Sequence, residues 1–128
     1  MGDPVVYVAG PYRAATPGLV AINVSRAERA AMDLLSRGYN VICPHTMMAG
    51  WDADDMLDDD AFLRNGLALL ARCDAVYVVA RAARTSDGAW FVSEGTRAEI
   101  GLAQRRGIPC FEAVELLNCW RKREFAGG

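Results

Sequence analysis

The sequence predicts an α/β fold of the flavodoxin-like or Rossmann-like kind, a three-layer sandwich around a four- to five-stranded parallel sheet. Short apolar runs alternate along the chain with longer helical patterns, an order that is typical of βαβ units. The runs are apolar throughout, as strands are when helices cover both faces of a sheet. A chain of 128 residues is long enough for one domain with one hydrophobic core, so we expect a single domain over residues 1–128.

The first apolar run and the pattern after it predict a strand followed by a helix. Residues 5–9 form a short β-branched run that ends at Gly10, which is typical of a buried strand. Apolar residues then recur at intervals of three and four, which predicts a helix over residues 18–37. Gly38 follows directly and suits the end of that helix.

The middle of the chain predicts a second strand, a loop and a second helix. Residues 39–43 read as a strand, and residues 46–60 contain six aspartates and predict a long, acidic, solvated loop. A hard-cation site in this loop is disfavoured, because the ligand spacing of an EF-hand is absent. A helix is expected over residues 60–72.

The last part of the chain predicts two further strands and two helices. Residues 75–79 are the strongest strand signal, and the polar stretch 81–88 follows them. A helix beginning at Ser93 or Thr96 is expected to end at Arg106, before a short strand at 108–111 and a helix over residues 114–120.

Composition excludes several classes of function. Fourteen Lys and Arg against sixteen Asp and Glu give a net charge of −2, so no basic surface for a nucleic-acid partner is expected. No apolar run approaches the roughly 20 residues that span a bilayer, and the start of the chain lacks the features of a signal peptide, so a cytoplasmic protein without a membrane partner is expected.

Cofactor and metal motifs are also missing. The chain has no G-x-G-x-x-G and no P-loop pattern, and one histidine, His45, without a Cys/His cluster around it, so no cofactor and no metal are expected. The four cysteines form no C-x-x-C pair, which indicates reduced thiols in a protein without a secretory signal.

The carboxyl ends of the predicted strands give the expected position of the site. Ligands of open α/β sheets bind outside these ends. Gly10 either ends a strand in a simple turn or lets a ligand approach the backbone. The guanidinium group of Arg13 has paired N–H donors that suit a phosphate or a carboxylate. His45 is either a hydrogen-bonding residue at a strand end or a base, and Trp90 either stacks on a planar ring or fills the core.

Residues 93–99 are the segment richest in chemical groups. Thr96 and Glu99 have the spacing of a capping box, which would leave Glu99 without a chemical role. Alternatively, Glu99 lies on an apolar helix face with Gly95, which clears space before the carboxylate, while Ser93 offers a hydroxyl at a helix start suited to an anion. Residues 91–95 also resemble a nucleophile elbow without its first glycine, so a serine hydrolase using Ser93 and His45 is a third hypothesis.

These residues together resemble the nucleoside 2-deoxyribosyltransferase-like superfamily, which includes small nucleoside 5′-monophosphate N-glycosidases. The resemblance covers roughly residues 5–111 and is carried by the run Val6–Tyr12, Asn23 at the opening of a helix, the runs Gly38–His45 and Arg72–Val76, and the pattern Ser93-x-Gly95-x-x-x-Glu99. It implies a flavodoxin-like parallel sheet and a homodimer or larger homo-oligomer with active sites near subunit interfaces.

The resemblance also implies roles for individual residues. Glu99 matches the nucleophilic glutamate of the family, and Ser93 matches a serine that contacts the sugar 5′ end or its phosphate. Tyr12 and Arg13 fall in the first substrate loop. The implied reaction is attack of a carboxylate on C1′ of a nucleoside or nucleotide, with retention of configuration and without a cofactor.

One position departs from the family pattern. Family members carry an aspartate eight residues before the aspartate that matches Asp74, and this chain has Gly66 there. The resemblance gives that aspartate a role with the nucleobase and in proton transfer. Its absence predicts a slower enzyme, a different base specificity, or a binding module that does not cleave nucleotides; Asp58, Asp59 or Asp60 are alternative sources of a carboxylate.

Overall fold

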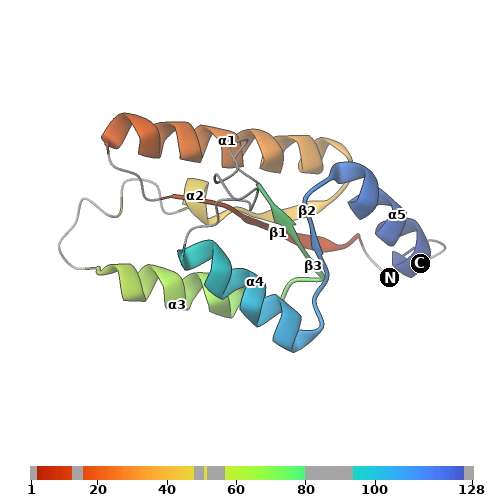
Figure 1. Cartoon of the computed structure of the whole chain (residues 1–128). Coiled ribbons are helices and arrows are strands. Elements are labelled where there is room, and N and C mark those ends of the chain that lie inside the picture. Colours follow the sequence, from red (N-terminus) through yellow and green to blue (C-terminus); the bar gives the residue numbers. More distant parts are fainter. Residues whose placement is uncertain (1–2, 13–15, 48–50, 52–56, 80–93, 126–128) are drawn as a thin grey trace, which may run out of the picture.

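The computed structural model describes residues 3–12, 16–47, 51, 57–79 and 94–125. In chain order the elements are β1 (Val5–Ala9), α1 (Pro17–Ser36), β2 (Asn40–Ile42), α2 (Pro44–Met47), α3 (Asp59–Leu70), β3 (Ala75–Val78), α4 (Glu94–Arg106), β4 (Cys110–Phe111) and α5 (Val114–Phe125) (Figure 1). Each strand and helix expected from the sequence is confirmed, with small differences at the ends. Two differences are larger: the first residues of the expected acidic loop form the short helix α2, and α5 continues beyond Trp120. The polar stretch 81–88 lies outside the described residues.

The sheet has four parallel strands in the order β2-β1-β3-β4. The chain starts at β1 in the middle, passes to β2 at one edge, and then crosses to β3 and β4 on the other side. The connection that follows β1 therefore leads toward one edge of the sheet, and the connection that follows β3 leads toward the other edge. In sheets of this kind the crevice at the carboxyl ends of these two strands is the usual position of a ligand. The flavodoxin-like fold class is thus confirmed.

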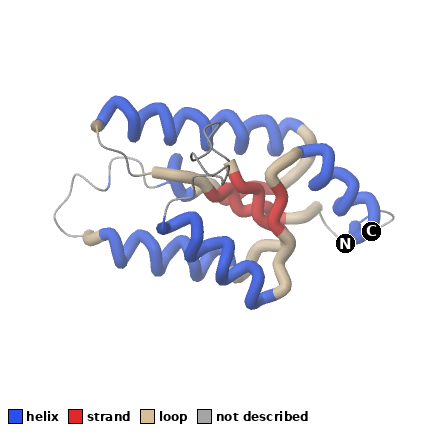
Figure 2. The backbone as a smooth tube through the Cα atoms, in the orientation of Figure 1, coloured by secondary structure: helices blue, strands red, loops and turns tan. Residues whose placement is uncertain are grey.

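Helices cover both faces of the sheet, as the apolar strands predicted (Figure 2). Val6 and Val8 of β1 pack in one core layer with α1 and with Leu117 of α5. Tyr7 and Ala9 point to the opposite face and pack in a core layer with Leu70 at the end of α3 and Ala103 of α4. Alternation along β1 therefore assigns Tyr7 to the layer that contains α4, because successive strand residues face opposite sides of a sheet.

The amino-terminal edge of the sheet is tied together by Arg121 of α5. Its guanidinium donates hydrogen bonds to the carbonyls of Arg37 (3.0 Å) and Gly38 (3.2 Å), pairs with Asp3 at 2.6 Å, and lies 4.5 Å from the centre of the Tyr39 ring. Gly38 has a φ of +89°, a conformation in which a side chain is strained, so a glycine is needed where α1 turns into β2. These contacts hold the edge opposite to the expected site.

Two further expectations can be compared with the structure. The four cysteines are free thiols, with Cys43 and Cys73 buried and Cys119 exposed. No helix in the described part of the chain has the length and apolar character needed to cross a membrane.

Candidate active site at the carboxyl edge of the sheet

Helix α4 carries Glu99 on its buried side. The helix begins at Glu94, so Thr96 lies within its first turn and cannot be the residue that caps it. Thr96 is buried, with 3% of its surface exposed. The capping-box interpretation of Thr96 and Glu99 is therefore wrong, and the Glu99 side chain is available for another role. Its apolar neighbour on the same face, Ala103, is fully buried in the core layer beneath the sheet, as the helical pattern predicted.

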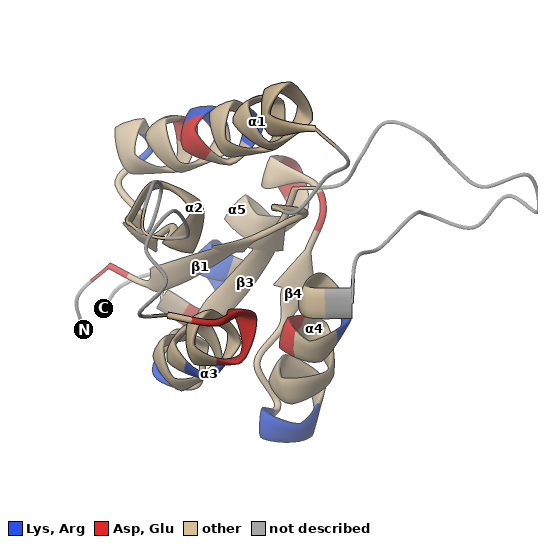
Figure 3. Cartoon of the chain, turned by 90° about the vertical axis from the view of Figure 1, so that its left-hand side faces the viewer, with Lys and Arg blue, Asp and Glu red and all other residues tan. Residues whose placement is uncertain are grey.

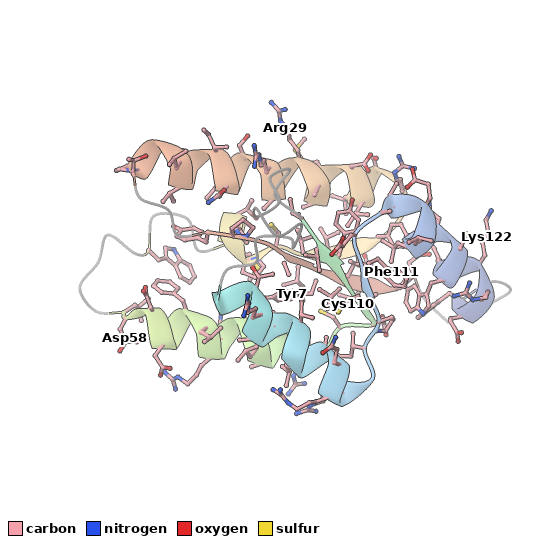
Figure 4. The ribbon with its side chains drawn as sticks, viewed as in Figure 1. Tyr7, Arg29, Asp58, Cys110, Phe111 and Lys122 are labelled. Atoms are coloured by element: carbon pink, nitrogen blue, oxygen red, sulfur yellow. The ribbon has the colours of Figure 1, made fainter. Side chains whose placement is uncertain are left out.

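The Glu99 carboxylate meets the hydroxyl of Tyr7. Tyr7 is 1% exposed and lies on the side of the sheet that α3 and α4 cover (Figure 4). Burial raises the pKa of Glu99 from 4.5 to about 7, and the hydrogen bond from Tyr7 limits this rise because it favours the charged carboxylate. Burial and the nearby Glu99 charge raise the pKa of Tyr7, so the phenol keeps its proton and acts as the donor. Raised carboxyl pKa values of this kind are frequent at catalytic sites.

Gly66 of α3 completes this group. It is buried, and a Cβ atom built at this position would lie 2.7 Å from the Tyr7 hydroxyl oxygen, which is too close for a real contact. The absence of a side chain therefore lets α3 approach the sheet closely enough to enclose the hydroxyl. We call Tyr7, Gly66 and Glu99 the carboxylate cluster; it brings together residues from β1, α3 and α4.

A second group of residues holds the segment that follows β1. Asn23 of α1 is buried and donates a hydrogen bond to the Tyr12 carbonyl at 3.1 Å. His45 of α2 contacts the Pro11 carbonyl through Nε2 at 3.0 Å, and its ring lies 5.7 Å from the ring of Tyr12. Because a carbonyl only accepts, Nε2 carries the proton, and the buried Nδ1 is left without a partner among the described residues. Burial lowers the pKa of His45, so the ring is neutral at pH 7.

A small hollow of about 10 Å³, on the order of one water molecule, lies beside this group. It is lined by Gly10, Pro11, Asn23, Arg26, Ala27, His45 and Val79. A Cβ atom at Gly10 would lie 3.2 Å from Val79, so packing against the end of β3 accounts for this glycine.

The structure thus places the expected site residues in two groups along the carboxyl half of β1. Glu99 and Gly95 belong to α4, on one side of the sheet, and Gly10, Tyr12 and His45 lie next to α1 and α2. Tyr7 and Gly10 are about 10 Å apart along the strand, at about 3.3 Å per residue. Three further expected site residues, Arg13, Trp90 and Ser93, lie outside the described residues.

Alternative chemistries find little support in these positions. The Nε2 atom of His45 donates to a backbone carbonyl, so it is not free to act as the base of a serine hydrolase. Among the aspartates considered as substitutes for residue 66, Asp58 accepts a hydrogen bond from the Ala61 amide at the start of α3, and Asp60 pairs with Arg64 at 3.6 Å. Within the described residues, no group of three His, Cys, Asp or Glu side chains is placed to hold a metal ion.

Two residues of the site were not singled out from the sequence as site residues. Tyr7 was assigned only to a buried strand, and Asn23 only to the start of a helix. A signal for Tyr7 existed, because a phenol in an otherwise aliphatic buried strand requires a hydrogen-bond partner. The sequence did not indicate which carboxylate would provide it.

The fold resembles the folds of several solved structures. Among solved structures, a 2-deoxyribosyltransferase from Bacillus psychrosaccharolyticus matches with a TM-score of 0.53 at 20% identity, over 83% of this chain and 69% of the other. A CMP N-glycosidase from Clostridium botulinum matches with a TM-score of 0.51 at 18% identity, over 83% and 67%. A conserved protein from Enterococcus faecalis V583 matches with a TM-score of 0.58 at 17% identity, over 98% and 77%. The fold expected from the superfamily resemblance is therefore confirmed.

The family is shown by the sequence. Residues 4–113 match a family described as a domain of unknown function, DUF7768, and the chain belongs to this family. No curated protein matches the chain.

Proposed function

We propose that the protein cleaves the N-glycosidic bond of a nucleoside or a nucleoside 5′-monophosphate, with Glu99 as the nucleophile. The observation that carries this proposal is the partly buried carboxylate of Glu99 on α4, which accepts a hydrogen bond from the hydroxyl of Tyr7, a buried residue in the middle of β1. The N-glycosidic enzymes with the same fold support it.

The proposed reaction has two displacement steps. A carboxylate oxygen of Glu99 bonds to C1′ while the bond between C1′ and the base breaks, through an oxocarbenium-like transition state. Water then attacks C1′ and frees the carboxylate, or a second base takes the sugar in a transfer reaction. Two inversions retain the configuration at C1′.

Tyr7 positions the nucleophile in this scheme. Its hydroxyl donates to the carboxylate and leaves the second carboxylate oxygen for attack on C1′. Because the Glu99 pKa is about 7, a large share of the enzyme carries the reactive carboxylate at neutral pH. The low solvation of the carboxylate keeps it a stronger nucleophile than an exposed carboxylate.

The remaining site residues are assigned to substrate binding. Asn23 and His45 hold the backbone at Pro11 and Tyr12, and the Tyr12 ring lies against the His45 ring. We assign the binding of the base, sugar and any phosphate to Gly10, Tyr12, Arg13, His45, Trp90, Ser93 and Gly95.

A second candidate is a non-catalytic module that binds nucleotides or their derivatives. Gly66 favours it, because this position lacks the carboxylate that the resemblance assigns to base and proton handling. A module of this kind would keep binding while no bond is broken.

The two candidates are separated by measuring free base after incubation with ribo- and deoxyribonucleosides and their 5′-monophosphates. We expect release by the wild type, loss of release in Glu99→Gln, and unchanged release in Glu115→Gln, which removes an exposed carboxylate on α5. Tight nucleotide binding without any release would establish the binding module instead.

We also propose, from the resemblance, that the protein forms a homodimer or larger homo-oligomer. The outer surface of α1 carries the exposed apolar side chains Ile22, Met32 and Leu35. A second copy of the chain packed on this surface would bury them and remove them from contact with water. Light scattering coupled to size-exclusion chromatography should give at least twice the monomer mass, and a mass of 13.9 kDa would contradict this assignment.

A further inference from the structure

The Glu99 carboxylate lacks a positively charged partner in the described part of the chain. Burial and the Tyr7 hydroxyl are the two influences on its pKa there. The nearest basic residue on the facing helix α3, Arg64, is exposed and pairs with Asp60. On α4 itself, Arg97 is exposed, and Arg105 and Arg106 lie in the last turn. A partly buried anion without a counter-ion is unfavourable, and a bound cation would relieve that cost.

Position 66 offers no acid to protonate a departing base. The Tyr7 hydroxyl occupies the space in front of Gly66, because a Cβ atom there would lie 2.7 Å from the hydroxyl oxygen. The phenol itself is a poor acid, since burial and the Glu99 charge both hold its proton in place. The carboxylate cluster therefore contains a nucleophile, Glu99, next to the Tyr7 hydroxyl, which keeps its proton and does not transfer it to a departing base.

From the packing of Gly66 against Tyr7, and because the Glu99 carboxylate has no positively charged partner among the described residues, we propose that the preferred substrate is an N-glycoside whose base is already positively charged, such as a pyridinium ribonucleoside. This inference rests on the proposed N-glycosidic activity and names its substrate class. It gives the carboxylate the positive charge that the described residues do not provide.

The bond changes balance without an acid for such a substrate. A carboxylate oxygen of Glu99 bonds to C1′, and the electron pair of the bond between C1′ and the ring nitrogen moves to that nitrogen. The pyridinium ring leaves as a neutral base, and the anionic carboxylate becomes a neutral glycosyl ester. Water then attacks C1′, Glu99 leaves as the carboxylate, and the proton of water passes to solvent. A neutral nucleoside, in contrast, releases a base anion that must take up a proton.

The charge of the surrounding surface agrees with a cationic ligand. Asp58, Asp59 and Asp60 are exposed at the beginning of α3, and Figure 3 shows this acidic end of α3 beside α4. These aspartates also stabilise the amino-terminal end of the helix, so they add to the argument without carrying it. The field of carboxylates at this end favours the approach of a cation.

The test compares two ligands of nearly the same shape that differ in charge. Nicotinamide riboside carries a pyridinium ring, and its 1,4-dihydro form is neutral. We expect the wild type to release nicotinamide at least tenfold faster than it releases the base of the dihydro form, uridine or adenosine, at pH 8. Release should be absent in Glu99→Gln for every substrate and unchanged in Glu115→Gln.

A variant of the chain tests the same reasoning from the protein side. Removal of the hydroxyl in Tyr7→Phe leaves room for a side chain at residue 66, because its Cβ atom would then have the ring carbon Cζ at 4.0 Å as its nearest neighbour. The double variant Tyr7→Phe/Gly66→Asp supplies an acid and should reduce the preference for the cation at least tenfold relative to Tyr7→Phe. Circular dichroism identifies a variant that does not fold, and the wild-type comparison then decides alone.

The outcomes separate the two proposals. Glu99-dependent release of neutral bases at rates equal to or above that of nicotinamide would overturn the charge preference and leave the N-glycosidic activity in place. Release from none of the substrates would overturn both. Faster release from the pyridinium substrate supports both.

Discussion

Replacement of Glu99 by glutamine should stabilise the protein at alkaline pH and change its stability little at acid pH. Glutamine has the shape of the protonated glutamate, and its carbonyl oxygen can still accept the hydrogen bond from Tyr7. Folding raises the Glu99 pKa from 4.5 to about 7, so the folded state binds a proton more tightly than the unfolded state. The wild type therefore loses stability as the pH rises from about 4.5 to about 7.

The magnitude follows from the size of the pKa change. At about 1.4 kcal/mol for each pKa unit, the change corresponds to about 3 kcal/mol of destabilisation once Glu99 is ionised in both states. Glu99→Gln does not carry this charge, so it should exceed the wild type by about 3 kcal/mol in the free energy of unfolding at pH 8, and its melting temperature should be about 10 °C higher. Near pH 4 the two proteins should have nearly the same stability.

Urea unfolding followed by circular dichroism at pH 4.5, 6 and 8 measures this difference. The subtraction of wild type from variant removes the contribution of His45, whose titration is shared by both proteins. Glu115→Gln is the matched control and should give no difference that depends on pH. The reasoning is refuted if Glu99→Gln is less stable than the wild type at pH 8, or if the stability difference is the same at all three values.

Three further predictions concern packing, the amino-terminal edge and the reaction. Gly66→Ala should lower the free energy of unfolding by about 1–2 kcal/mol, because the overlap of the new Cβ atom with the Tyr7 hydroxyl outweighs the gain in helix propensity. Urea unfolding measures this change in stability. Arg121→Ala should destabilise by about 1–3 kcal/mol through loss of its carbonyl hydrogen bonds, ion pair and ring contact, whereas Arg123→Ala on the same helix should have little effect. The value of kcat/KM for base release should rise with pH to a plateau, with a midpoint near pH 7 where Glu99 ionises.

Each of these predictions has a contradicting result. Gly66→Ala should regain stability when Tyr7→Phe is added, and a double variant as unstable as Gly66→Ala alone would show that the hydroxyl is not the obstacle. Equal effects of Arg121→Ala and Arg123→Ala would remove the special role of Arg121. A flat pH profile between pH 5 and 8 would show that Glu99 is not the group whose ionisation controls the reaction.

The order of the elements could be predicted from the sequence because the signals are local. The β-branched runs at β1 and β3 and the glycines after α1 and α4 define strands and helix ends within a few residues of their observed positions. The expected position of the candidate site was derived from topology, since parallel strands bring their carboxyl ends to one edge. The face of α4 that carries Glu99 was predicted correctly because helical spacing determines which residues share a face.

The partners of Glu99 could not be predicted in the same way. Tyr7 and Gly66 are far from Glu99 in the sequence, and their contact depends on how closely α3 approaches the sheet, a distance that no local pattern encodes. The resemblance predicted a slower enzyme because Gly66 replaces an aspartate, and Gly66→Asp alone would then be expected to increase the rate. The structure indicates that this substitution is blocked by the Tyr7 hydroxyl, and that a carboxylate at position 66 requires Tyr7→Phe as well.

The covalent intermediate is the most direct test of the proposed function. A 2′-fluoro-substituted substrate, such as the 2′-fluoro arabino analogue of nicotinamide riboside, destabilises the oxocarbenium-like transition states and slows the release of the sugar from the enzyme. Mass spectrometry of the intact protein and of its peptides should then show one added sugar on the peptide that contains Glu99, and none in Glu99→Gln. Base release by a protein that carries no sugar on Glu99, or carries it on another residue, would contradict the account.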